Sequence, residues 1–196
     1  MKSQATSRER LLEAASELFY RDGVSIGVDA LCKAAGVSKK SMYQLFRSKD
    51  EVIAESLAAR GPYYNALLLP SPDDERSPRE RILSVFERED ELAATNEYFG
   101  CPFVSTATEL KNPEHPGSVV ARHFKQALTD FFRAELVRAG AEDADTLAIQ
   151  LTMIFDGAGA RAVVRAQPLH NVGVQLAGTV LDAAGVRAEQ LAAHAR

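Results

Sequence analysis

Helix-start signals recur along this chain and constrain its fold more than any other feature. At three expected helix starts, a Ser or Thr stands three residues before a Glu: Thr6 and Glu9, Ser48 and Glu51, and Ser77 and Glu80. In such a capping box each side chain bonds the backbone N–H of the other residue, which satisfies donors that a helix start leaves open. Apolar residues at three- and four-residue spacing follow each box, as a helix buried on one face requires. No convincing apolar–polar alternation indicates a strand, so we expect an all-α fold.

The same signals, with Gly and Pro as stops, place the helices along the chain. We expect them at about 7–21, 28–35, 39–46, 48–60, 78–94, 103–110, 118–139, 143–164 and 172–184. Gly61-Pro62 is expected to end the fourth helix. The clearest linker is Pro70–Pro78, with three prolines and four charges. The predicted parts are a three-helix N-terminal domain (1–48), a connecting helix (49–69), a loop (70–78) and a helical bundle (79–196).

Bulk composition excludes several classes of protein. No apolar run approaches the roughly 20 residues of a membrane span, and the N-terminus MKSQATSRER lacks the apolar segment of a secretion signal. Cys32 and Cys101 fit neither a disulfide framework nor a metal spacing. The formal net charge of −4 divides into +2 over residues 1–60 and −6 over residues 61–196. We therefore expect a cytoplasmic protein with a division of labour between its two parts.

Residues 25–60 carry a helix, a tight turn and a second, cationic helix. Gly36 suits the sharp bend, Val37 fills the angle between the helices, and Ser38 caps the second one. The stretch from Leu31 to Lys49 holds five Lys or Arg and no acid. A helix-turn-helix with a cationic second helix is how many proteins place side chains in the DNA major groove.

The spacing divides the DNA-facing residues into two groups. The start of the second helix faces away from its anchors Met42 and Phe46, and Gln44 can hydrogen-bond adenine. Residues at the end of this helix and at the next helix start suit phosphates. The predicted base contacts are Lys39, Lys40, Ser41 and Gln44, and the predicted phosphate contacts are Tyr43, Ser48 and Lys49. A merely solvated basic helix face is the alternative, and the combination of turn, cap and following SKDE favours DNA.

A long and specific sequence pattern lies within residues 7–60. It consists of two stretches, RERLLEAASELFYRDG and VDALCKAAGVSKKSMYQLFRSKDEV. Together they resemble the N-terminal domain of the TetR/AcrR family of transcriptional regulators. The resemblance implies the same four groove residues, and phosphate contacts from Tyr43 and Lys49. Three positions depart from the family pattern: Gly27 replaces a common Thr or Ser, Lys40 a usual Gly, and Leu45 a common His. The operator is therefore not expected to match a relative's, and Leu45 is expected to pack.

The C-terminal half has a weaker likeness to the same family. GCPFVSTATELKNPEHP and AGAEDADTLAIQLTMIFDGAGARAVV are similar to the effector-binding and dimerisation region of one branch of these regulators. The similarity implies a helical bundle with a buried ligand cavity, and a homodimer built from the last two long helices.

Aromatic residues with a few polar ones are the candidates for the ligand cavity. They are Phe86, Tyr98, Phe99, Phe103, Phe124, Phe131 and Phe155, with Thr106, Glu109 and Asp156. An aromatic set at helical spacing equally suits a plain core, and that alternative stays open for each residue. Glu109, His115, His123 and His170 do not have the spacing of a metal site, so no metal or other cofactor is expected.

Small residues in the last two predicted helices indicate close helix packing. A glycine inside a helix costs about 1 kcal/mol relative to alanine, so a packing reason is expected. Small side chains let two helices approach closely, as in a four-helix dimer interface. The predicted interface is Gly157, Ala160, Val164, Gln175, Gly178 and Leu181. Relief of crowding inside one subunit is the alternative.

These observations predict a ligand-responsive DNA-binding transcriptional regulator. We expect a repressor that binds a pseudo-palindromic operator as a homodimer and is released by a small-molecule effector. An activator of the same fold is an alternative, as is a helical adaptor that binds protein. An enzyme would use Cys101 as nucleophile or Glu109 with His115 for acid–base chemistry. Because the chain has no Gly-rich phosphate loop, nucleophile elbow or metal motif, we do not expect an enzyme.

Overall fold

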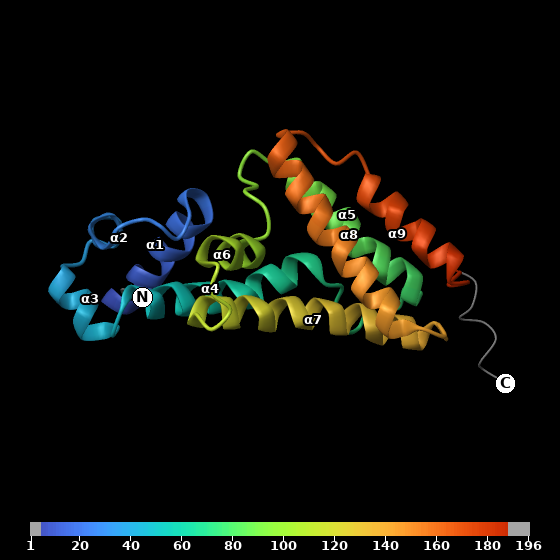
Figure 1. The fold of residues 1–196 in the computed structure, drawn as a ribbon, viewed down its shortest axis with the longest axis horizontal. Helices are drawn as coiled ribbons and strands as arrows, with labels where there is room; N and C mark the ends of the chain where they lie inside the picture. The colour runs from blue at the N-terminus through green and yellow to red at the C-terminus, as the bar shows by residue number, and fades with distance from the viewer. Residues whose placement is uncertain (1–4, 188–196) are drawn as a thin grey trace. The chain divides into compact units, whose positions relative to one another are not determined.

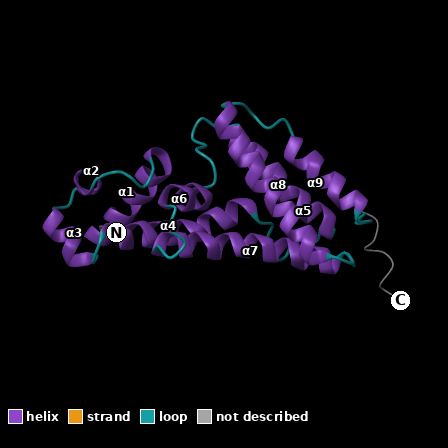
Figure 2. Cartoon of the chain, in the orientation of Figure 1, coloured by secondary structure: helices purple, strands orange, loops and turns teal. Residues whose placement is uncertain are grey.

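The computed structural model describes residues 5–187, and this part of the chain is helical without strands (Figure 1, Figure 2). The prediction of an all-α fold is confirmed. The first four residues, part of the N-terminal segment considered above, lie outside the described range. The helices are α1 (Ser7–Asp22), α2 (Val28–Ala35), α3 (Lys39–Leu45), α4 (Lys49–Leu68), α5 (Pro78–Ala93), α6 (Pro102–Leu110), α7 (Pro116–Arg138), α8 (Ala144–Arg165) and α9 (Val172–Ala183).

The chain divides into two compact units, and α4 and α7 contribute residues to both. The first unit comprises residues 1–63 and 102–124, and the second comprises residues 64–101 and 125–196. A single apolar cluster holds the first unit together. Its fully buried members come from α1 to α4: Leu11, Ala15, Leu31, Met42 and Val52. Burial of a large apolar side chain contributes roughly 1.5–3 kcal/mol, so this cluster fixes how α3 packs on α1 and α2.

Two of the three predicted capping boxes form completely. Thr6 with Glu9 starts α1 and Ser77 with Glu80 starts α5, each with both reciprocal hydrogen bonds. At the third, the Ser48 hydroxyl accepts a hydrogen bond from the N–H of Glu51, at 3.2 Å. The Glu51 carboxylate instead accepts from the N–H of Arg47, at 2.5 Å. Ser48 therefore caps α4 as predicted, whereas the Glu51 side chain bonds the residue before Ser48 and the box does not close.

Helix α4 does not end at Gly61-Pro62, and the predicted stop is wrong. The helix continues through Pro62 to Leu68. A proline inside a helix removes a hydrogen bond and strains the preceding turn. Packing between Gly61 and the Phe124 ring offsets the cost of this proline. The ring lies so close to Gly61 that an added Cβ would overlap it.

The second unit has an aromatic core with one buried ion pair. Phe86 stacks on Phe132 with ring centroids 5.7 Å apart, and Phe155 meets Phe86 edge-on at 6.1 Å. Beside this core, Arg81 Nε donates to Glu135 Oε1 at 2.9 Å, and both side chains are buried. These contacts join α5, α7 and α8.

Helix α8 is long and apolar enough to pass a composition test for a membrane span, with mean hydropathy 1.3 over its best window. No membrane span was expected from the sequence. Core helices of soluble proteins pass the same test, so the finding is weak evidence for a membrane.

Candidate nucleic-acid interface and candidate effector site

The turn between α2 and α3 is closed by backbone hydrogen bonds. Gly36 has φ 63° and ψ 36°, the left-handed conformation that glycine adopts without a steric penalty. Its N–H and that of Val37 both donate to Cys32 O, the latter at 3.0 Å. The start of α3 is fixed too, because the Ser38 hydroxyl accepts from the N–H of Ser41 at 3.0 Å.

The face of α3 that points away from the core is exposed. Met42 and Phe46 are buried, whereas Lys39, Lys40, Tyr43 and Gln44 are exposed. The Ser41 hydroxyl lies 2.9 Å from Ser38 Oγ and takes part in the cap. This arrangement turns the first residues of α3 toward solvent, where a DNA major groove could receive them. Leu45 was expected to pack, but 39% of it is exposed.

Two predicted DNA contacts have partners within the protein. Lys39 Nζ lies 2.8 Å from Asp29 Oδ1, and this hydrogen-bonded pair raises the pKa of Lys39. Lys49 Nζ donates to Val24 O at 2.6 Å and so ties the start of α4 to the loop after α1. A contact of Lys39 with a base, or of Lys49 with a phosphate, must compete with these bonds. Lys40 has no such partner among residues 5–187.

Arg47 is a cation at this surface that the list of DNA contacts left out. Its side chain is 92% exposed, although Nη2 lies 3.0 Å from Glu51 Oε1. It stands between Phe46 and Ser48, directly after α3. The sequence signal that could have identified Arg47 is its position in the stretch from Leu31 to Lys49, which is basic and has no acid.

The predicted ligand residues fall into the two units. Phe103, Thr106, Glu109 and Phe124 belong to the first unit. The others belong to the second unit: Phe86, Tyr98, Phe99, Phe131, Phe155 and Asp156. In the first unit, Phe103 stacks on Phe124 with centroids 4.7 Å apart, and Phe124 also packs on Gly61. This pair thus contributes to helix packing.

Glu109 has a structural contact. Its Oε2 accepts a hydrogen bond from the N–H of Val24 at 2.8 Å, next to Gly23. Gly23 has φ 85°, so the chain needs glycine there to turn after α1. Glu109 therefore holds the α1–α2 loop to α6.

Sequence reasoning missed Glu89, the most unusual ionisable group of the second unit. Only 2% of it is exposed, and neither carboxyl oxygen has a hydrogen-bond partner among the described residues. Burial raises the pKa of Glu89 to about 9, with Asp156 and Asp90 adding to the rise and Lys125 opposing it. At neutral pH this side chain is a neutral acid. In the sequence, only its spacing of three residues from Phe86 indicates that Glu89 lies on the same face of the helix as the core.

The surroundings of Glu89 include several predicted ligand residues. Lys125 Nζ lies 2.5 Å from Asp156 Oδ1 and 4.9 Å from the centroid of the Phe155 ring. Gly159 leaves the space that Glu89 Oε1 and Tyr98 Oη occupy, because an added Cβ would lie 2.9 and 2.8 Å from them. The buried polar groups of α5, α7 and α8 thus gather beside the aromatic core.

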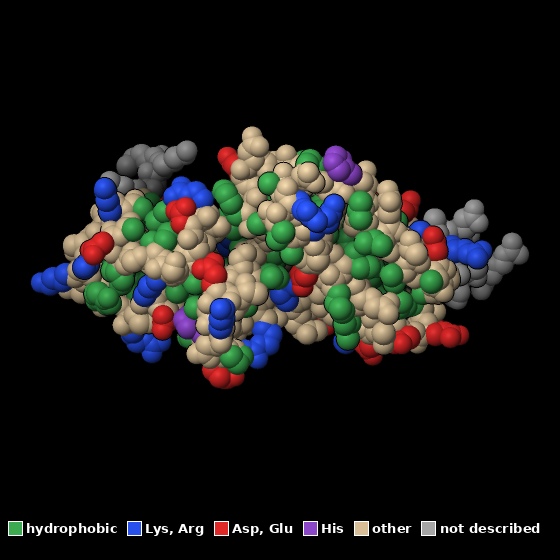
Figure 3. Space-filling model, turned by 45° about the horizontal axis from the view of Figure 1, so that its top comes forward, with side chains coloured by type: hydrophobic (Ala, Val, Ile, Leu, Met, Phe, Trp, Pro, Cys, Tyr) green, Lys and Arg blue, Asp and Glu red, His purple; other side chains and the backbone are tan. Residues whose placement is uncertain are grey.

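The predicted dimer residues differ in their exposure. Gly157, Ala160, Val164 and Gln175 are exposed and Gly178 is partly buried, while Leu181 lies in the core of its own unit. The surface of α8 and α9 also exposes large apolar side chains that the prediction did not include: Ile149, Met153, Val163, Val172 and Leu176. Figure 3 shows hydrophobic side chains at the surface in this part of the molecule.

The residues considered for metal binding or catalysis have other partners. No group of three His, Cys, Asp or Glu residues could hold a metal ion within residues 5–187. His115 Nε2 lies 3.3 Å from Asp50 Oδ1 and Glu109 bonds the Val24 N–H, so neither is directed at the other by these contacts. Cys101 is buried.

Comparison with known proteins gives relatives of one kind. Residues 11–56 match the family model of bacterial regulatory proteins described as the tetR family. A solved TetR-type transcriptional regulator from Streptomyces avermitilis is 54% identical with a TM-score of 0.91, over 93% of this chain and 100% of that chain. A TetR-family regulator from Streptomyces coelicolor is 22% identical with a TM-score of 0.74, over 91% and 95% of the two chains. That second likeness concerns the fold alone.

A curated relative agrees with these matches. The uncharacterized HTH-type transcriptional regulator YxaF of Bacillus subtilis is 26% identical over 80% of this chain and 85% of its own length.

Proposed function

The chain belongs to the TetR family of transcriptional regulators, and on that premise we propose that it is a repressor which a small-molecule effector releases from its operator. As a member of the family it is a DNA-binding regulator of transcription. The proposal assigns it no enzymatic activity. Repression and homodimerisation are typical of the family. In the proposal the protein acts in the cytoplasm as a homodimer on a pseudo-palindromic operator, without a cofactor.

The observation that carries the proposal is the exposed cationic start of α3 on a rigidly packed helix-turn-helix. Lys39, Lys40, Ser41 and Gln44 are assigned to bases, and Tyr43, Ser48 and Lys49 to phosphates, with Arg47 added to the second group. Lys40 and Gln44 suit guanine and adenine edges respectively. Tyr43 is 55% exposed.

The apolar surface of α8 and α9 supports a homodimer. Met153, Val164 and Leu176 are 68%, 82% and 52% exposed. Large apolar side chains grouped on one surface commonly mark an interface, and a two-fold axis would bury the same surface of both subunits. Gly157 and Ala160 lie between them on α8 and would allow close approach. Leu181, buried in its own unit, is removed from the proposed interface.

The aromatic and polar cluster of the second unit is the proposed effector site. Phe86, Phe155, Tyr98 and Asp156 remain its proposed contacts, and Glu89 joins them. A buried acid without a hydrogen-bond partner costs free energy that a ligand donor could recover. Effector binding would shift the population between a DNA-binding and a released arrangement.

Selection of duplexes from a random DNA pool tests the proposal. We expect one recurring site with two inverted half-sites, their centres about one helical turn or a multiple of it apart. Selected duplexes without a repeated half-site would contradict the dimeric operator. A transcription assay on a promoter that carries the site distinguishes repression from activation.

A further inference from the structure

The corner between α6 and α7 contacts the first turn of α4, within the first unit. His115 is the residue before α7, and its Nε2 lies 3.3 Å from Asp50 Oδ1. An added Cβ at Gly117 would lie 2.9 Å from Ile53 Cγ2, so the backbone of α7 begins directly against α4. Asp50 and Ile53 are three residues apart and share one face of α4. The start of α7 therefore lies along the first turn of α4, beside the residues proposed to contact phosphates.

The orientation of the His115 ring is fixed because this residue caps α7. Its Nδ1 accepts a hydrogen bond from the N–H of Gly117 at 3.0 Å, and its backbone oxygen accepts from the N–H of Val119 at 3.0 Å. Since Nδ1 is an acceptor, the neutral ring carries its proton on Nε2, the nitrogen that faces Asp50. Only 11% of the His115 side chain is exposed. The start of α7 thus directs one N–H at the Asp50 carboxylate.

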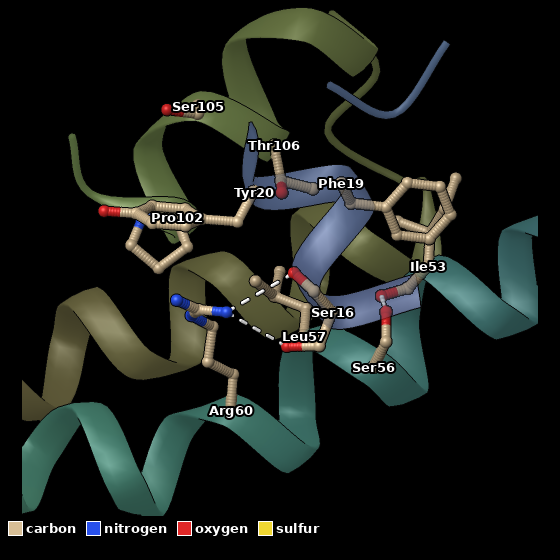
Figure 4. Close-up of a pocket in the computed structure, with 10 residues that line it drawn as sticks. All are labelled: Ser16, Phe19, Tyr20, Ile53, Ser56, Leu57, Arg60, Pro102, Ser105 and Thr106. Atoms are coloured by element: carbon tan, nitrogen blue, oxygen red, sulfur yellow. Dashed lines mark hydrogen bonds between the residues drawn. The ribbon is translucent and has the colours of Figure 1, made fainter. Parts of the chain in front are cut away.

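Beyond its first turn, α4 is held by α1. Ile53 lies beside Phe19 of α1 at a small pocket that residues of α1, α4 and α6 line (Figure 4). Further along α4, Arg60 Nη1 donates to the backbone oxygen of Ser16 at 3.3 Å and to its hydroxyl at 3.1 Å, as the dashed lines in Figure 4 mark. These contacts fix α4 from Ile53 onward, and Asp50 lies before them.

The first turn of α4 is connected to the α6–α7 segment at two neighbouring residues. Lys49 Nζ donates to Val24 O, and the N–H of Val24 donates to the Glu109 carboxylate, so α6 reaches Lys49 through Val24. The next residue, Asp50, meets His115 and has no other ionic partner among residues 5–187. A change in the α6–α7 segment would therefore reach the proposed phosphate contacts without any change in α3.

We propose that His115 is a positioning residue for DNA binding: its Nε2–H holds the Asp50 carboxylate, and with it the first turn of α4, in the arrangement that receives a DNA phosphate. The proposal rests on the proposed assignment of Ser48 and Lys49 to phosphates. Free N–H groups at a helix start bind phosphate. A carboxylate of the same turn, once released from its partner, would compete for those N–H groups and repel the phosphate. The contact with His115 prevents this competition.

Two variants separate the two contacts of the His115 ring. Asparagine is a good helix cap with a short side chain, so His115→Asn keeps the bond to the Gly117 N–H and loses the contact with Asp50. Glutamine is a poor cap but can place a donor where Nε2 lies, so His115→Gln keeps the contact and loses the cap.

The two variants should therefore have opposite effects on operator affinity and on stability. Affinity for the selected duplex is measured by fluorescence anisotropy, and stability by the melting temperature of the full-length protein. We expect His115→Asn to bind about three- to tenfold more weakly at a nearly unchanged melting temperature. His115→Gln should bind within about twofold of the wild type but melt at a lower temperature. Affinity that follows the melting temperature in both variants would overturn the proposal, because His115 would then act on stability alone.

Asp50→Asn completes a double-mutant cycle, a readout that a purely structural role of His115 would not change. In that background His115→Asn should change affinity by less than about twofold, because there is no carboxylate to release. His123→Asn, the same substitution at an exposed position of α7, is the control and should bind like the wild type. An equal loss of affinity in both backgrounds, or no loss in His115→Asn alone, would overturn the proposal. Failure of the proposed DNA-binding surface would appear separately, as unchanged binding in Lys40→Gln.

Discussion

At the scale of single residues, neighbouring lysines of α3 are in different situations. Lys39 pairs with Asp29, whereas Lys40 has no ionic partner in the described part of the chain. Both are exposed, so simple charge counting would treat them as equal. The sequence predicted both on the exposed face of α3, and both are exposed there. It could not reveal the pairing, because Asp29 lies on another helix.

Asp29→Asn should strengthen operator binding, because it frees Lys39 without removing any cation. We expect an increase of about two- to tenfold at low salt, decreasing as salt screens the charges. Fluorescence anisotropy with the selected duplex measures it. Glu17→Gln, an exposed acid of α1, serves as the charge-matched control. An unchanged affinity in Asp29→Asn would show that Lys39 takes no part in binding.

Glu89 makes stability depend on pH in a defined direction. Its pKa is about 9 in the folded protein and near 4.5 in an exposed chain. The unfolded chain therefore loses this proton first, and stability decreases as pH rises from about 4.5 to 9, by at most about 1.4 kcal/mol per pH unit.

Glu89→Gln should remove that slope and raise the melting temperature at pH 8 relative to the wild type. Glu87→Gln, an exposed position on the same helix, is the control and should keep the wild-type slope. Melting temperatures across pH 5–9 provide the measurement. A parallel pH profile in Glu89→Gln and the wild type would mean that Glu89 is ionised in the folded protein.

At the scale of helices, local signals predicted starts better than ends. Thr6 and Ser77 cap their helices as the capping boxes predicted, because the partners are three residues apart in the chain. Gly61-Pro62 failed as a stop because Phe124, more than sixty positions away, packs on Gly61. Glu109, a predicted ligand residue, has a contact of the same kind, because its bond to the Val24 N–H joins distant segments. Spacing along the sequence predicts contacts within a helix, but it does not predict contacts between distant segments.

Gly61→Ala should destabilise the protein by about 1–3 kcal/mol, the usual range for overpacking, because its Cβ would overlap the Phe124 ring. Phe124→Ala removes the ring, and Gly61→Ala should cost less in that background. Denaturant unfolding of the four proteins of this cycle measures the coupling. Additive effects would show that Phe124 does not hold α4 together at Gly61.

Glu109→Ala should loosen the α1–α2 loop. The bond from Val24 N–H to a carboxylate contributes about 1 kcal/mol or more, so exchange of that amide hydrogen should accelerate about fivefold. Glu114→Ala, at an exposed position of the loop after α6, is the control. If Val24 exchanged at the wild-type rate in Glu109→Ala, the bond would not protect the loop in solution.

At the scale of the whole molecule, the proposal joins two copies through α8 and α9. Leu181, a predicted interface residue, lies on the face of α9 that packs within its own unit. Met153, which the proposal adds, is exposed, although a Met at helical spacing usually suits a core. Met153→Glu should produce a monomer and weaken operator binding by at least about tenfold, since each half-site alone contributes only part of the affinity. Light scattering measures the mass. A dimeric Met153→Glu protein would contradict the proposed interface.

The central claim, that the exposed start of α3 contacts DNA, is tested most directly by the salt dependence of operator binding. The measurement compares the wild type with Lys40→Gln and with Lys111→Gln, an exposed lysine outside α3. We expect Lys40→Gln to weaken binding and to lower the slope of log affinity against log salt by about 1, whereas Lys111→Gln leaves both unchanged. Identical affinity and slope in the wild type and Lys40→Gln would contradict the account.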